Sequence, residues 1–228
     1  MRYPIHLILV LVLSFCSCKH RNINPKENTQ HQDIYQILGT VKQRDSTWVY
    51  LSLFEKNRIK LHDSALVNKD SFVFSGSVDY PRKAVIFLNK HDGVFIFILA
   101  NESSHIVLAP VLSKSQIYNS PINDSLNKVL QKSKHIYQKI DYLFPKLQKA
   151  RVENNYENLK KIKRQIDQIL LENNRYLLDY IKRHPHNAIA GILLNEMWAD
   201  AQKDSLQLIE TAKLLDKNIQ KNLDFVIP

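Results

Sequence analysis

The chain has 228 residues, of which 44% are hydrophobic, and 32 Lys or Arg against 22 Asp or Glu give it a formal net charge of +10. Four glycines and eight prolines exclude a low-complexity chain, and the apolar content is sufficient for a buried core. A chain this basic in the cytoplasm would be a candidate for nucleic-acid binding, but its N-terminus argues for export.

Residues 1–18 have the layout of an export signal. A short basic head precedes an apolar run, Leu7 to Phe15, of nine residues. This run is far shorter than the roughly 20 residues that a membrane-spanning helix needs. It ends at Ser17-Cys18, a small residue followed by cysteine. We therefore expect residues 1–17 to be a signal peptide; an ordinary signal or a short anchor helix is the alternative.

The Ser17-Cys18 junction resembles the lipobox of bacterial lipoproteins, in which the cysteine carries the lipid and becomes the new N-terminus. Cys16 is a second candidate, but cleavage there would place the bulky Phe15 beside the cut. The resemblance implies lipid attachment at Cys18 and a location in the cell envelope, facing the periplasm or in the outer membrane. Since Cys16 and Cys18 are the only cysteines, no thiol would remain for disulfides or catalysis. The polar segment 18–32 is then expected to be a flexible tether.

Residues 33–120 are predicted to form a β-rich domain, because apolar residues recur there with a period of two. Asp92-Gly93, between apolar runs 84–88 and 94–100, is a strong hairpin signal. We expect six or seven short strands in an antiparallel β-sandwich or barrel-like sheet. Two strands have a clear inward face, composed of Val49, Leu51 and Leu53 in one, and of Phe72, Phe74, Gly76 and Val78 in the other.

Residues 121–228 are predicted to be α-helical, so the fold class is α+β. Asn123 or Asp124 is expected to cap the first helix, and Pro145 to kink or break it. A second helix should pair with it as an antiparallel hairpin that turns near residues 152–155. The two helices carry apolar stripes with spacings of three and four, and these comprise Leu126, Val129, Ser133, Ile136, Ile140, Leu143 and Leu147 in the first, and Leu159, Ile162, Ile166, Ile169, Asn173, Tyr176 and Tyr180 in the second.

Two further helices are expected. His184-Pro185 should end the second helix, and Asn187 can cap a third. A fourth should start near Asp204-Ser205. Their expected buried residues are Ile189, Ile192, Leu193, Met197 and Trp198 in the third, and Leu206, Ile209, Leu214 and Leu215 in the fourth.

Several of these segments resemble a known family. The pattern in Ile37–Val41, Val49–Leu51 and Phe72–Val78, followed by Pro81, resembles the domain of unknown function 4369, which occurs in Bacteroidetes lipoproteins. Tyr180–Pro185, Asn187 and Leu193-Leu194 resemble the helical segment that follows this domain. In many members a thioredoxin-like domain of the membrane-anchored thiol–disulfide oxidoreductase type comes next.

This sequence departs from that architecture, because it ends at Pro228, where the thioredoxin-like domain would begin, and has no Cys-x-x-Cys. No catalytic residue of the family has a matching position. We expect a non-catalytic, membrane-anchored envelope lipoprotein that binds or scaffolds an envelope partner. The alternative is an accessory or truncated part of a thiol–disulfide oxidoreductase system whose catalytic domain is missing or separately encoded.

Other motifs point to simpler roles. His184-x-His186 could offer two metal ligands, but no third lies at a characteristic spacing, so no metal site and no cofactor are expected. Acidic residues near strand ends suit turns better than a hydrolase pair, and the serines lack a Gly-x-Ser-x-Gly motif. Alternating aromatic residues are expected mainly in the core. The acidic residues are Asp63, Asp70, Asp79 and Asp92, the serines are Ser71, Ser75, Ser77, Ser103 and Ser104, and the aromatic residues are Trp48, Tyr50, Phe54, Phe95 and Phe97.

Basic charge is concentrated in the helical part. Residues 125–183 hold fourteen Lys or Arg against six Asp or Glu. A solvated outer helix face explains this charge most simply. The functional alternative is attraction to anionic lipid head groups within a Debye length of roughly 8 Å, through Lys160, Lys161, Lys163 and Arg164. Nucleic acid is not expected as a partner of an exported protein.

Overall fold

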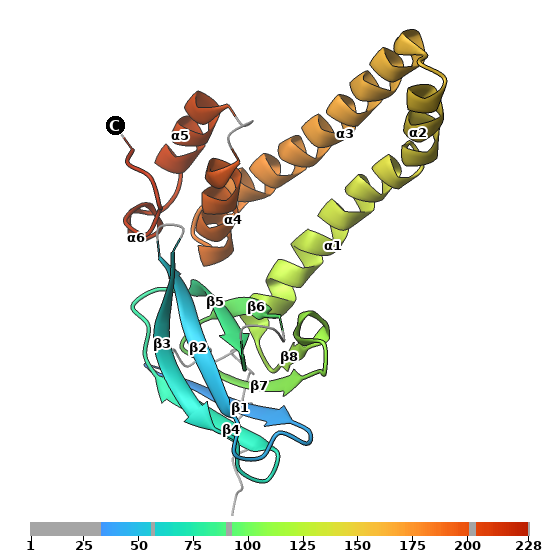
Figure 1. Ribbon diagram of the computed structural model, residues 1–228. Helices are drawn as coiled ribbons and strands as arrows, with labels where there is room; N and C mark the ends of the chain where they lie inside the picture. Colours follow the sequence, from blue (N-terminus) through green and yellow to red (C-terminus); the bar gives the residue numbers. More distant parts are fainter. Residues whose placement is uncertain (1–32, 56–57, 90–92, 201–203, 228) are drawn as a thin grey trace, which may run out of the picture. The chain divides into compact units, whose positions relative to one another are not determined.

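The computed structural model describes residues 33–55, 58–89, 93–200 and 204–227, which belong to one compact unit (Figure 1). The predictions for residues 1–32, which include the signal peptide, Cys18 and the tether, lie outside the described residues.

The N-terminal half of the described chain consists of two four-stranded sheets. The first has the strand order β4 (Ser71–Gly76), β1 (Tyr35–Val41), β7 (Ser103–Leu108) and β8 (Gln116–Tyr118). The second has the order β3 (Arg58–Leu66), β2 (Trp48–Glu55), β5 (Arg82–Phe87) and β6 (Phe95–Leu99). A short 3₁₀ helix, Leu112–Lys114, precedes β8.

One apolar core is shared by the two sheets. Val49, Leu51 and Leu53 of the second sheet are buried in the same cluster as Phe72 and Phe74 of the first. This confirms the predicted inward faces, which follow from the alternation of side chains along a strand. The antiparallel pairing of β5 with β6 confirms the hairpin prediction, and Gly93 has a φ of +78°.

The sheets differ from the prediction in two respects. There are eight strands among the described residues instead of six or seven. The additional strand, β3, lies at the sheet edge, and both of its faces are largely exposed. In addition, β1 pairs in parallel with β7, while every other strand pair is antiparallel. A parallel pair joins strands that are distant in sequence, so local periodicity does not reveal it.

Three helices form the predicted antiparallel hairpin: α1 (Pro121–Asp141), α2 (Phe144–Val152) and α3 (Tyr156–Arg183). Pro145 lies in the first turn of α2, which confirms the predicted break after α1. A buried hydrogen bond of 2.6 Å from Ser133 Oγ to Asn173 Oδ1 joins α1 to α3. Members of the two predicted apolar stripes pack together in shared clusters, which lie in the helical core and at the far end of the hairpin.

The predicted cap of α1 is wrong. Ser120 caps the helix, its Oγ accepting a hydrogen bond from the backbone N–H of Asn123, and Pro121 occupies the first turn. The Asn123 side chain is buried and turned toward β6 instead. The predicted cap at Asn187 is confirmed, because its side chain accepts from the Ile189 N–H.

Three shorter helices complete the chain: α4 (Ala188–Ala199), α5 (Ser205–Lys213) and α6 (Lys217–Gln220). The predicted buried face of α5 is wrong in part, since Leu206 and Leu214 are 74% and 57% exposed. A second stripe with helical spacing packs inward, and its small residues allow a close approach to α4. This stripe comprises Leu208, Thr211, Ala212 and Leu215.

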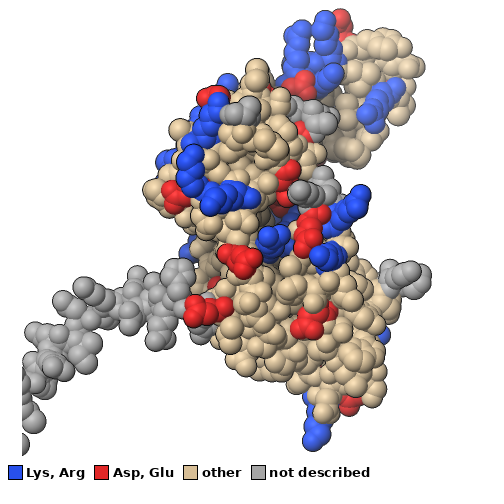
Figure 2. Space-filling view, turned by 90° about the vertical axis from the view of Figure 1, so that its left-hand side faces the viewer, with Lys and Arg blue, Asp and Glu red and all other residues tan. Residues whose placement is uncertain are grey.

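Charge is unevenly spread over the molecule. On the face shown in Figure 2, Lys and Arg side chains gather over the helical part, while the sheets below carry few. Within the described chain, no helix is both long enough and apolar enough to cross a membrane.

Candidate functional site

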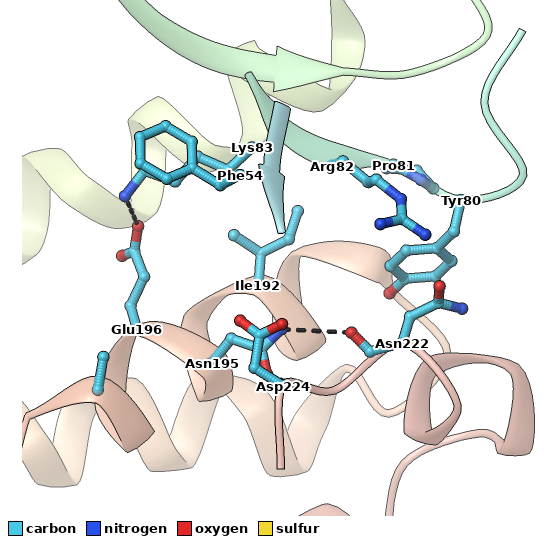
Figure 3. A pocket seen from close by; sticks show the side chains of 11 residues that line it. Phe54, Tyr80, Pro81, Arg82, Lys83, Ile192, Asn195, Glu196, Asn222 and Asp224 are labelled. Carbon is cyan, nitrogen blue, oxygen red and sulfur yellow. Dashed lines mark hydrogen bonds and ion pairs between the residues drawn. The ribbon is translucent and has the colours of Figure 1, made fainter. Parts of the chain in front are cut away.

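A cleft of about 280 Å³ lies between the second sheet and helix α4 (Figure 3). Strand β2 contributes Phe54, and the start of β5 with the two residues before it contributes residues 80–83. Helix α4 and the C-terminal segment 222–224 form the opposite side. The remaining lining residues are Ile192, Asn195, Glu196, Ala199, Asn222 and Asp224.

Tyr80 holds the sheet side of the cleft against the helices. Its ring is buried in the helical core, and its hydroxyl donates a hydrogen bond to the Ala188 carbonyl oxygen at 3.3 Å. Burial raises the pKa of Tyr80 far above its ordinary value. The phenol therefore stays protonated at physiological pH and serves as a packing group and donor.

Gly191 allows this close packing. A Cβ at Gly191 would lie 2.6 Å from Ile219 Cγ2 and 3.1 Å from the Tyr80 hydroxyl. Any larger residue would push α4 away from the sheet and from α6. The close packing at Gly191 therefore fixes the distance between α4 and Tyr80. Ile192, the next residue, lines the cleft.

An ion pair spans the cleft. Lys83 Nζ lies 2.8 Å from Glu196 Oε1 and 5.3 Å from the centre of the Phe54 ring. Both charged side chains remain partly exposed, so the pair contributes at most about 1 kcal/mol to stability. Its main effect is to fix the position of a positive and a negative group beside an apolar floor.

Asn195 fixes the C-terminal wall of the cleft. Its Nδ2 donates to the Asn222 carbonyl oxygen at 3.3 Å, and its Oδ1 accepts from the Asp224 backbone N–H at 2.8 Å. These two bonds hold a segment of turns and bends that follows α6. The side chains of Asn222 and Asp224 consequently lie at the cleft (Figure 3).

A second hollow adjoins the cleft and shares Arg82, Asn222 and Asp224 with it. It is more polar, and Glu55, Arg58 and Lys221 contribute further charges of both signs. The two hollows together present an apolar floor beside alternating cations, anions and amides. Such a surface can bind a ligand by apolar contact and by oriented hydrogen bonds.

The residues that sequence reasoning singled out lie elsewhere. His184 stacks on Tyr180 and hydrogen-bonds its carbonyl oxygen at 2.8 Å, whereas His186 pairs with Asp216 at 2.7 Å. The two histidines thus use their ring nitrogens in different local contacts. Among the residues that the structure describes, no three His, Cys, Asp or Glu side chains converge as a metal site would require.

The described members of the acidic and aromatic sets do not form a site either; Asp92 lies outside the described residues. Asp70 accepts from the Gln43 backbone N–H and so joins two turns that are 27 positions apart, and Asp63, inside strand β3, accepts from the N–H of the following Ser64; both are structural contacts. Phe95 and Phe97 are core residues, as expected. Of the predicted aromatic set, Phe54 is the member that lines the cleft.

The cleft residues carried little signal in the sequence. Arg82, Lys83 and Glu196 are ordinary charged residues at strand or helix ends, and 113 positions separate the two members of the ion pair. Pro81 belongs to the pattern of the family resemblance, which implies no binding role for it. A pattern search along the chain cannot find a site that is assembled from segments this far apart.

Residues 35–126 match the model of the family described as a domain of unknown function (DUF4369). The matched segment covers all eight described strands and the first residues of α1. No curated protein matches the chain. The sheet side of the cleft lies inside the matched segment, and the helical side, from Ile192 to Asp224, lies outside it.

Proposed function

We propose that this chain, whose residues 35–126 form a DUF4369 domain, is a lipid-anchored, non-catalytic binding protein of the bacterial cell envelope. The cleft between β2, β5 and α4 is its proposed binding site. The observation that carries this proposal is the set of contacts that hold the cleft's polar groups in fixed positions, above all the 2.8 Å pair of Lys83 with Glu196.

A binding role suits these contacts better than an acid–base role. A general acid or base must be free to exchange its proton with a substrate. In the cleft, Lys83 and Glu196 neutralise each other, the Asn195 amide is used by the C-terminal segment, and Tyr80 is protonated and buried. Groups held in this way can orient a ligand without reacting with it.

The size and chemistry of the cleft favour a polypeptide partner. About 280 Å³ is just below the range of small-molecule sites, which begins at about 300 Å³, and it leaves room for about one or two side chains of a partner. Phe54, Pro81 and Ile192 would contact an apolar side chain of the partner. The flanking charges and amides would bind the backbone and polar side chains beside it.

The envelope location is supported by the N-terminal sequence. An apolar run of nine residues followed by Ser17-Cys18 suits export and acylation. An acyl anchor at Cys18 would hold the described domain near a membrane surface, where other envelope proteins are concentrated. Cleavage at that position would also leave a mature chain without a free thiol.

Site-specific photocrosslinking in the living cell tests the binding site. A benzophenone amino acid replaces the exposed Ala199, which lines the cleft, or the exposed Leu206 of α5 as a control position. We expect a discrete adduct with an envelope protein at Ala199 that is absent at Leu206. Arg82→Glu should abolish this adduct. Equal adducts at both positions, or an adduct at Ala199 that is unaffected by Arg82→Glu, would refute the cleft as the binding site.

A second candidate function is that of an accessory to a thiol–disulfide oxidoreductase system whose thioredoxin-like domain is separately encoded. The DUF4369 match favours it, because the sequence resembles chains in which such a domain follows. The same experiment separates the candidates. An adduct partner with a Cys-x-x-Cys motif supports the redox accessory, and a partner without one supports a binding module of another kind.

A further inference from the structure

The far end of the helical hairpin exposes large apolar side chains. This hairpin end, defined here as residues 142–164, comprises α2, the short links on either side of it and the first part of α3 (Figure 1). Tyr142, Val152 and Tyr156 are 79%, 83% and 77% exposed, and Phe144 is also exposed. Among the described residues, Val226 is the one other large hydrophobic residue that is more than three-quarters exposed.

These side chains are not displaced members of the core. The interior of the hairpin end is already filled by Leu143, Ala150 and Ile162, which are buried in a cluster of their own. Tyr142 and Phe144 flank Leu143 and therefore project outward while it projects inward. Exposed apolar groups that cluster in this way mark an interaction surface.

The same surface is strongly basic. The hairpin end contains seven Lys or Arg and two Glu. Lys146 and Lys149 of α2 and Lys161 of α3 line one hollow of about 330 Å³, in which Glu153, 3.8 Å from Lys149, is the acidic lining residue. Lys160, Lys163 and Arg164, in the same part of α3 as Lys161, are also exposed. Figure 2 shows Lys and Arg gathered in the upper part of the molecule.

We propose that the hairpin end binds the surface of an anionic phospholipid membrane. Lysines that converge in a hollow suit the phosphate oxygens of lipid head groups, because each ammonium group is a compact donor of hydrogen bonds. Tyrosine suits the interface itself, because its hydroxyl can stay hydrated while its ring is buried, and phenylalanine suits the apolar layer just below. Exposed aromatic residues within a basic surface favour a membrane over an acidic protein, whose charge would need no such apolar contact.

This inference goes beyond the cleft and does not need the lipid at Cys18. It can therefore be tested on a chain that starts at Lys19, which keeps every described residue, both sheets, all helices and the three apolar clusters. A negative result would leave the proposed anchor and the proposed cleft untouched.

Vesicle flotation measures the binding. We expect this chain to float with vesicles that contain about one third phosphatidylglycerol and not with pure phosphatidylcholine. Binding should weaken strongly near 1 M salt, where the Debye length falls to about 3 Å. Equal binding to both kinds of vesicle, or none to the anionic vesicles, would overturn the proposal.

Charge variants locate the surface. Replacing Lys160, Lys161, Lys163 and Arg164 with Gln should lower partitioning onto anionic vesicles at least tenfold, because each cation near such a surface contributes up to about fivefold. The matched control replaces four exposed lysines elsewhere, so the net charge changes equally; these are Lys42, Lys69, Lys114 and Lys217. An equal loss in both variants would mean that net charge alone drives binding, which contradicts a specific surface.

An environment-sensitive dye reports insertion. A chain that starts at Lys19 has no cysteine, so Phe144→Cys or the control Leu206→Cys gives a single labelling site. With anionic vesicles, the dye at 144 should shift to the blue and brighten, and the dye at 206 should not. A shift at 206 without one at 144 would refute insertion of the hairpin end.

Discussion

The side chain of Asn123 in helix α1 forms two backbone hydrogen bonds with Ile98 at the free edge of strand β6. The Ile98 N–H donates to Asn123 Oδ1, and Asn123 Nδ2 donates to the Ile98 carbonyl oxygen, both at 2.8 Å. Nδ2 also donates to Ser120 Oγ at 2.7 Å. The amide thus imitates a neighbouring strand and joins the helices to the second sheet.

Asn123→Ala should lower the free energy of unfolding by about 2–4 kcal/mol, because it leaves a buried N–H and a buried C=O without partners. Asn123→Asp should also be destabilising, since a carboxylate cannot donate to the Ile98 oxygen. Urea denaturation measures both changes. Asn127→Ala, an exposed asparagine one turn later, is the control and should have little effect. A neutral Asn123→Ala variant would contradict the role of this amide.

Gly39→Ala should destabilise the first sheet. A Cβ at Gly39 would lie 1.9 Å from Cζ of Phe72, its partner across the β1–β4 pair, so the ring would have to move. We expect a loss of about 1–3 kcal/mol in urea denaturation.

The double variant Gly39→Ala with Phe72→Leu provides the control, because the smaller side chain makes room for the added methyl group. The double variant should lose less free energy of unfolding than the two single variants lose in sum. If the two changes are simply additive, the clash with Phe72 is not the cause.

The polar contact inside the hairpin should fix the pairing of α1 with α3. Asn173 accepts from Ser133 Oγ at 2.6 Å and donates to Tyr137 Oη at 3.0 Å, within otherwise apolar stripes. Asn173→Ala should cost about 1–3 kcal/mol, because it leaves the buried Ser133 hydroxyl without its acceptor.

The double variant Ser133→Ala with Asn173→Leu should lose less free energy of unfolding than the two single variants lose in sum. A double-mutant cycle in urea measures this coupling, with the exposed Gln168→Ala of α3 as a control for helix effects. A coupling near zero would show that the two side chains act independently.

Glu102 makes the stability of the fold depend on pH. Burial raises the pKa of Glu102 above its ordinary value of 4.5, outweighing hydrogen bonds from the Ser120 hydroxyl and the Ile122 N–H, which lower it. The folded protein therefore holds this proton more tightly than the unfolded chain does. The resulting stabilisation is present below about pH 4.5 and is lost as the pH rises through the raised pKa.

Glu102→Gln keeps an acceptor for Ser120 but cannot ionise. The free energy of unfolding of this variant, minus that of the wild type, should be larger near neutral pH than near pH 4. Thermal unfolding across this range measures the difference. A difference that is constant with pH would show that Glu102 is not the responsible group.

Where the apolar pattern is local, the sequence was sufficient to predict the fold. The inward faces of β2 and β4, the break at Pro145 and the cap at Asn187 each follow from residues within one or two turns or strands. Strand β3 was not predicted, because its apolar alternation is short: Ile59 and Leu61 are followed by Asp63, and the strand is largely exposed at the sheet edge.

The remaining features depend on contacts between distant segments. On α5, two stripes have helical spacing, and packing against α4 decides that Leu208 and Ala212 are buried instead of Leu206. The cap of α1 at Ser120 has a local signal, because a serine followed by Pro121 is a common helix start. The contact of Asn123 with Ile98 has no such signal, since it joins positions 25 apart. The cleft likewise exists only because α4 packs on Tyr80.

The most direct test of the central claim is metabolic labelling of growing bacteria with a tagged fatty acid, comparing the wild type with Cys18→Ala. We predict that the wild-type chain becomes labelled, is found in the membrane fraction without residues 1–17, and that Cys18→Ala abolishes the label. Recovery of an unlabelled wild-type chain from the cytosol, with both cysteines still present, would contradict the proposal of a lipid-anchored envelope protein.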